Sequence, residues 1–157
     1  MKKTVISLYV ALAACFCVCA QPAPASFRQT WQKGPGWLRN AVIYQVYPSS
    51  YKDSDGNGIG DIPGVISKLD YIGSLGVTAI WFNPIFESGW IDGGYDVIDF
   101  YKVDPRFGTN NDLVELVRQA HSRGIKMIMD IVTNHCGSAH WWMKDLPSST
   151  WINYPEN

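Results

Sequence analysis

Short apolar runs alternate with amphipathic stretches along the central part of the chain. The runs 41–47, 77–82 and 125–131 are rich in β-branched and aromatic side chains, which predicts three buried strands. Between them, residues 62–75 and the residues from Thr109 to Gly124 repeat apolar side chains every three or four positions, which predicts two helices. Thr109 and Asp112 have the spacing of a helix capping box. The order strand, helix, strand, helix, strand implies parallel pairing through right-handed crossovers.

The turn after the first predicted strand distinguishes two parallel architectures. An open doubly wound sheet would bind a phosphate at a glycine-rich turn in this position, but Asp53, Asp55 and Asp61 would repel a phosphate. We therefore predict an α/β fold that begins a (β/α)8 TIM barrel. A closed barrel of eight units needs about 250 residues, so residues 37–157 are expected to form an incomplete barrel of three strand–helix units.

The amino terminus predicts export. Lys2 and Lys3 precede an apolar run over residues 5–14 that is too short to span a bilayer, which is typical of a signal peptide over residues 1–20. Residues 12–15 also resemble a lipobox, which would place a lipid anchor on Cys15, whereas ordinary cleavage near Ala20 or Ala25 is the alternative. We expect residues 21–36 to form a linker and the protein to be secreted, periplasmic or a cell-surface lipoprotein.

The net charge and the cysteine content limit the ligands and the disulfides that can be expected. The net charge of −1 provides no basic face for nucleic acid and favours a neutral substrate. Beyond the predicted signal peptide only Cys136 remains, so no internal disulfide is expected there. A single cysteine without spaced partners is a weak metal ligand, and we expect Cys136 to be a small buried side chain.

Residues 53–61 place oxygen-bearing side chains at alternate positions, a spacing that suits a hard divalent cation. We predict a structural Ca²⁺ bound by the side chains of Asp53, Asp55, Asn57 and Asp61 and by the carbonyl of Ile59. Gly64 stands where a twelve-residue calcium loop has a bidentate Glu, and a strand rather than a helix is expected before the loop. A tight Asp/Asn/Gly turn without metal is the alternative.

Polar side chains follow the third predicted strand. Asp130, Asn134 and His135 come where the apolar run ends, and ligands of parallel α/β enzymes bind outside the carboxyl ends of the strands. These residues alone favour a strand end whose Asp and Asn cap a turn.

Several segments together resemble the α-amylase family, glycoside hydrolase family 13. Residues 41–51, 53–61, 94–97, 107–109 and 130–135 match its motifs in order and spacing, over about residues 37–157. The resemblance implies a retaining hydrolase that acts on an α-glucan or maltooligosaccharide, with calcium after the first strand and an inserted small domain that starts after the third.

By this resemblance, Asp96 and His135 hydrogen-bond the sugar at the cleavage subsite and Tyr95 forms an aromatic wall. Asp130 supports an arginine on the fourth strand. The two catalytic carboxylates of the family lie on later strands, so the present chain is predicted to hold no catalytic residue and to be inactive by itself. Phe100 and Cys136 depart from the Tyr and Thr that are usual in the family.

Two alternatives stay open. The same scaffold supports an isomerase or transglycosylase such as a trehalose synthase, and a chain without catalytic carboxylates could also be a non-catalytic surface glycan binder. The aromatic residues His140, Trp141, Trp142 and Trp151 fit sugar stacking and core packing equally well.

Overall fold

The computed structural model describes residues 34–152. The chain divides into two compact units, residues 1–40 and residues 41–157. The described part of the first unit holds one 3-10 helix, η1 (Gly36–Asn40). The predicted signal peptide, the lipid anchor at Cys15 and most of the linker lie outside the described residues. Within residues 34–152, no helix has both the length and the apolar character that a membrane crossing requires.

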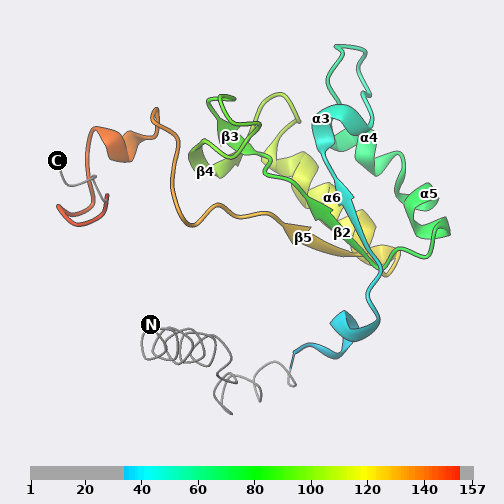
Figure 1. Ribbon diagram of the computed structural model, residues 1–157. Helices are drawn as coiled ribbons and strands as arrows, with labels where there is room; N and C mark the ends of the chain where they lie inside the picture. Colours follow the sequence, from blue (N-terminus) through cyan, green and yellow to red (C-terminus); the bar gives the residue numbers. More distant parts are fainter. Residues whose placement is uncertain (1–33, 153–157) are drawn as a thin grey trace, which may run out of the picture. The chain divides into compact units, whose positions relative to one another are not determined.

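The three predicted strands form one parallel sheet. Its strands are β1 (Ile43–Val46), β2 (Ala79–Phe82) and β5 (Lys126–Met129), in the order β1-β2-β5 (Figure 1). Ile43 pairs with Ala79, which in turn pairs with Lys126. Parallel pairing is therefore confirmed, although each strand is shorter than its predicted apolar run.

The prediction of one continuous helix over residues 62–75 is wrong. Residues 62–75 contain α4 (Ile62–Ile66) and α5 (Leu69–Ser74), separated at Ser67 and Lys68. The Ser67 hydroxyl donates to the carbonyl of Gly64 (2.6 Å), and the Lys68 amide donates to the Val65 carbonyl (2.9 Å). These local bonds tighten the turn and end the α-helical ladder. The periodicity continues across the break, and the buried residues are Ile62, Val65, Leu69 and Ile72.

The second predicted helix is confirmed as α6 (Asn110–Ser122). The Asp112 amide donates to the Thr109 hydroxyl (3.2 Å), and the Asp112 carboxylate accepts from the Thr109 amide (2.8 Å). This capping box satisfies two amide groups that a helix start would otherwise leave unpaired. Leu116 and Ala120 are buried on the face that packs against the sheet.

Three elements between residues 48 and 103 were not predicted. A one-turn helix, α3 (Pro48–Tyr51), lies between β1 and loop 53–61, so the expectation that a strand leads directly into this loop is wrong. Residues 85–107 contain an antiparallel pair, β3 (Phe86–Ser88) and β4 (Val97–Val103). Figure 1 shows this pair at the carboxyl ends of the parallel strands. The register of β3 and β4 is irregular, and no simple alternation of apolar side chains marks them in the sequence.

Helices pack against one face of the parallel sheet, whereas the other face is partly exposed. Alternate strand residues point to opposite faces. Val46, Ile80 and Phe82 belong to the core cluster with the apolar sides of α4, α5 and α6. On the other face, Ile43 is 45% exposed and Trp81 is 37% exposed. Because a parallel sheet is normally covered on both faces, the described residues complete only one half of the packing.

Candidate functional site

A chain of hydrogen bonds joins the carboxyl ends of the three parallel strands. The Gln45 amide nitrogen donates to the Asn83 side-chain oxygen (3.1 Å), and the Asn83 amide nitrogen donates to the Tyr95 hydroxyl (3.3 Å). The Tyr95 hydroxyl in turn donates to the Asp130 carboxylate (3.0 Å). The structure therefore brings Tyr95 and Asp130 together, although they lie 35 positions apart in the chain.

Tyr95 comes from loop 89–96, which connects β3 and β4. Burial raises the pKa of the Tyr95 hydroxyl, and its hydrogen bond to Asp130 raises that pKa further, whereas the bond from Asn83 opposes the rise. The hydroxyl is therefore held as a proton donor. Gly94 has a φ of 102°, and a Cβ there would lie 3.1 Å from the Pro84 carbonyl oxygen. Glycine thus lets the loop approach the end of β2 closely.

His135 lies beside Tyr95. Its Nε2 is 3.2 Å from the Tyr95 carbonyl oxygen, and its Nδ1 is 3.1 Å from the Asn134 side-chain nitrogen. The Asn134 amide can only donate, so Nδ1 accepts and Nε2 carries the proton that is donated to Tyr95. The imidazole is exposed. Tyr95, Asp130 and His135, all predicted site residues, therefore share one edge of the sheet.

Asp96, the fourth predicted sugar-site residue, points into its own loop. Its carboxylate accepts from the Ser88 hydroxyl (3.2 Å) and from the amides of Ile91 (3.1 Å) and Asp92 (3.2 Å). Burial alone would raise the pKa of Asp96, but the bonds from these donors outweigh it and lower the pKa. The contact of Asp96 with a sugar stays a prediction, while its contacts with the loop are direct.

Asp92 is a residue that the sequence analysis did not single out. It is exposed in the same loop, its carbonyl accepts from the Tyr95 amide (2.9 Å), and its charge contributes to the raised pKa of Tyr95. The loop sequence alone shows two aspartates near Tyr95 but does not show which of them faces inward.

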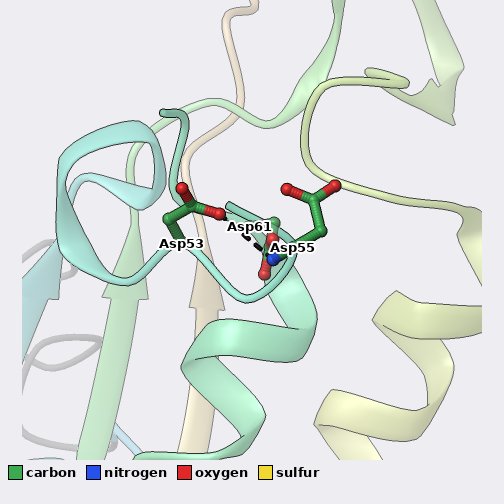
Figure 2. Close-up of side chains that lie close together, drawn as sticks. All are labelled: Asp53, Asp55 and Asp61. Carbon is green, nitrogen blue, oxygen red and sulfur yellow. Dashed lines mark hydrogen bonds between the residues drawn. The ribbon is translucent and has the colours of Figure 1, made fainter. Parts of the chain in front are cut away.

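The predicted calcium loop gathers three carboxylates. Oxygens of Asp53, Asp55 and Asp61 lie within 4.8 Å of one another (Figure 2). Figure 2 also shows the bond from the Asp55 amide to Asp53 (3.1 Å). Hydrogen bonds from Gly58 and Gly56 lower the pKa of Asp53, which is held ionised. The carboxylates and the Asn57 side chain are the hard oxygen donors that calcium prefers, so these residues fit the ion.

Asp61 and Gly64 explain how the loop joins α4. Asp61 is 6% exposed and accepts from the Gly64 amide (2.6 Å), which caps α4, and from the amide (3.0 Å) and hydroxyl (2.8 Å) of Ser54. A Cβ at residue 64 would overlap the Lys52 carbonyl oxygen. Position 64 therefore excludes the Glu that a twelve-residue calcium loop would place there.

The aromatic residues after β5 divide into packed and exposed rings. His140 is 2% exposed, its ring centroid is 4.2 Å from that of Trp142 and 5.8 Å from that of Phe100, and its Nδ1 accepts from the Trp142 amide (3.1 Å). Burial lowers the pKa of His140, and Asp99 partly offsets this. Trp141 is 55% exposed and Trp151 is 51% exposed. Packing thus accounts for His140, whereas the role of the exposed rings stays open.

Cys136 shows no feature of a reactive thiol. It is half-buried and forms no disulfide, and burial raises the pKa of its thiol. A raised thiol pKa disfavours the thiolate that a nucleophile or metal ligand needs.

Comparison with known proteins identifies relatives of this chain. The sequence model described as "Alpha amylase, catalytic domain" matches residues 45–156. Oligo-1,6-glucosidase IMA5 of Saccharomyces cerevisiae is 50% identical over 115 residues, which cover 73% of this chain and 20% of that protein. Trehalose-6-phosphate hydrolase of Escherichia coli is 50% identical over 111 residues, covering 71% and 20%.

Solved structures show the same similarity. Trehalose-6-phosphate hydrolase of Bacillus licheniformis has a TM-score of 0.68 at 50% identity, covering 71% of this chain and 20% of its own. The isomaltulose synthase SmuA of Protaminobacter rubrum has a TM-score of 0.69 at 44% identity, covering 70% and 20%. The chain therefore spans about a fifth of the length of these relatives.

Proposed function

Because the chain belongs to the α-amylase family, we propose that it is the amino-terminal part of a retaining glycoside hydrolase acting on short α-glucans. The observation that carries this proposal is the group of Tyr95, Asp130 and His135 at the carboxyl ends of the parallel strands.

The open face of the sheet supports an incomplete barrel. Ile43 and Trp81 are apolar yet exposed on the face opposite the helices. In a closed barrel this face lines the packed interior, and the free edges of β1 and β5 pair with further strands. The remaining strand–helix units and the inserted domain would belong to the complete protein.

In the complete enzyme, the residues described here bind and orient the sugar. Tyr95 forms one wall of the subsite, and the exposed His135 hydrogen-bonds a sugar hydroxyl. Asp130 orients the Tyr95 hydroxyl and supports a residue from a later strand. Asp96 accepts from hydroxyls at the far side of the ring, in addition to the loop donors that orient its carboxylate. Double displacement needs two further carboxylic acids about 5 Å apart, which later strands would supply. Orientation by the present residues lowers the entropic part of the barrier.

Calcium would stabilise loop 53–61 from outside the sugar site. Asp53, Asp55, Asn57 and Asp61 would supply side-chain oxygens and Ile59 its carbonyl, neutralising carboxylates that otherwise repel one another. The ion would act on the loop's structure and take no part in the reaction.

A hydrolase transfers the glucosyl group to water, whereas an isomerase transfers it to a sugar, so the products separate these two alternatives. Similarity to an isomaltulose synthase favours keeping an isomerase as the second candidate. The complete gene product should be incubated with maltose, isomaltose, trehalose 6-phosphate and sucrose. Free glucose from the first two supports the hydrolase, and conversion of a disaccharide to its isomer supports the isomerase. Retardation in a starch gel without any product supports the non-catalytic glycan binder and rejects both enzymes.

Export is proposed from the amino-terminal pattern alone. Radiolabelled fatty acid should label the wild-type protein but not Cys15→Ala if Cys15 carries a lipid. A wild-type protein without label would leave ordinary cleavage near Ala20 or Ala25 as the route, and equal labelling of both proteins would reject Cys15 as the lipid attachment site.

A further inference from the structure

A buried serine connects two carboxylates beneath loop 89–96. Ser88 is 7% exposed; its amide donates to Asp104 (3.3 Å), and its hydroxyl donates to Asp96 (3.2 Å). The same hydroxyl accepts from the Trp90 amide (3.0 Å). Ser88 thereby links Asp96, which accepts hydrogen bonds from the loop amides, to Asp104, which lies beneath the loop.

Asp104 anchors this network in the body of the domain. It is 3% exposed and accepts from the Trp90 indole N–H (2.7 Å) and from the Arg106 amide (3.0 Å). The Arg106 guanidinium lies 3.9 Å from the same carboxylate, and the Asp104 amide donates to the Ile85 carbonyl (2.8 Å). A buried carboxylate is tolerated only with such partners, so its position is closely defined.

Trp90 has an unusual backbone that its side chain holds in place. With a φ of 56°, it is the one non-glycine residue with positive φ in the part of the chain that the structure describes. This region is unfavourable for a bulky residue and persists only where the surroundings impose it. The indole packs edge-on against Phe107 (5.4 Å between centroids), and the Arg106 guanidinium lies 4.4 Å from the ring centroid.

We propose that Ser88, Trp90 and Asp104 are positioning residues for the sugar site, because they fix loop 89–96 in the conformation that presents Tyr95 and Asp96. The inference rests on the proposed function. The Asp96 carboxylate accepts from the Asp92 amide, and the Asp92 carbonyl accepts from the Tyr95 amide, so the network reaches Tyr95 through Asp96. A loop that is ordered before binding lowers the entropic cost of binding.

The test is a kinetic comparison in the complete enzyme. Trp90→Phe keeps an aromatic ring but removes the N–H that reaches Asp104, and Ser88→Ala removes the hydroxyl that links Trp90 to Asp96. For the α-glucoside that the wild type cleaves, each variant is expected to raise KM about fivefold to tenfold and to change kcat less than twofold, since ground-state binding is lost. Ile72→Val, in the buried core of α5, is the control that lowers thermal stability without changing KM.

The outcomes separate the two proposals. A raised KM with conserved kcat in either folded variant, absent in Ile72→Val, supports the inference. Unchanged KM with a lower Tm shows a purely structural network, and failure of both variants to fold shows the same; either result overturns the inference while leaving the proposed function intact. A wild-type enzyme without activity on any α-glucoside overturns the proposed function itself and, with it, the role of these residues at a sugar site.

Discussion

Loops 53–61 and 89–96 are both organised by aspartates, but they obtain their order from different sources. In the first loop, the carboxylates of Asp53 and Asp55 accept bonds from amides at most five residues away, and they cluster with Asp61. In the second, Asp96 is joined through Ser88 to Asp104, which is buried and paired with Arg106. A local cluster of like charges needs a counterion, whereas a network that spans two strands contains its own.

The largest expected effect comes from the second loop. Asp104→Ala would leave the Trp90 indole N–H, the Ser88 amide and Arg106 without their shared acceptor. We expect the free energy of unfolding to fall by about 2–4 kcal/mol, because the Trp90 indole N–H and the Ser88 amide each lose their acceptor in a largely buried site, at about 1–3 kcal/mol per group. Urea denaturation of the complete protein measures this change. A loss below about 1 kcal/mol would show that the network contributes little to stability.

The next largest effect is a change in Tm when calcium binds loop 53–61. Calcium at about 100 times its Kd should raise the Tm by several degrees, because a ligand that binds only the folded state stabilises it. Chelator should reverse the shift, and Asp53→Asn should abolish it. Trp90→Phe is the matched control and should keep the full calcium response. Absence of both a heat of binding in calorimetry and a chelator effect would reject the calcium site.

A smaller effect is expected at the junction between loop 53–61 and α4. Asp61→Ala removes the side chain that caps α4 at the Gly64 amide. Loss of a helix cap costs about 1 kcal/mol. Asp61→Asn should retain much of this stability because its side-chain oxygen can still accept. Equal denaturation midpoints for Asp61→Ala and wild type would show that the cap is not needed.

The smallest effect concerns pH and the support of β4. Burial holds the pKa of His140 below its ordinary value of 6.5. The folded state therefore favours neutral His140, so stability is fully present above about pH 6.5 and decreases as the pH falls toward the folded-state pKa. His140→Phe should flatten the profile of urea midpoints between pH 7.5 and 5, and the exposed control His121→Gln should not. Superimposable profiles for wild type and His140→Phe would contradict this prediction.

The sequence predicts the features of this fold whose determinants are local. The Thr109–Asp112 capping box and the three apolar strands need only neighbouring residues, and all were found. The break at Ser67 was missed because the apolar period runs unchanged through it. The β3–β4 pair was missed because its irregular register leaves no alternating pattern.

The candidate site shows the same limit. Asp130 and His135 were expected at one edge of the sheet, since polar residues at the ends of parallel strands meet there, whereas Tyr95 was assigned to the site only by the family resemblance. The inward turn of Asp96 depends on Ser88, and the network beneath it depends on Asp104, which lies on the far side of β4 in the chain. No spacing rule connects these residues, so only the folded arrangement shows that the Asp96 carboxylate accepts from its own loop.

The close approach of residue 64 to the Lys52 carbonyl limits how loop 53–61 could change. No side chain fits at this glycine, so single substitutions cannot add the bidentate ligand that makes twelve-residue calcium loops tight sensors. Affinity could be altered only by changing the number of charges within residues 53–61 or by supplying water as a ligand. We therefore expect this loop to be confined to the role of a constitutive brace, and a design that seeks a calcium-responsive switch should begin elsewhere in the domain.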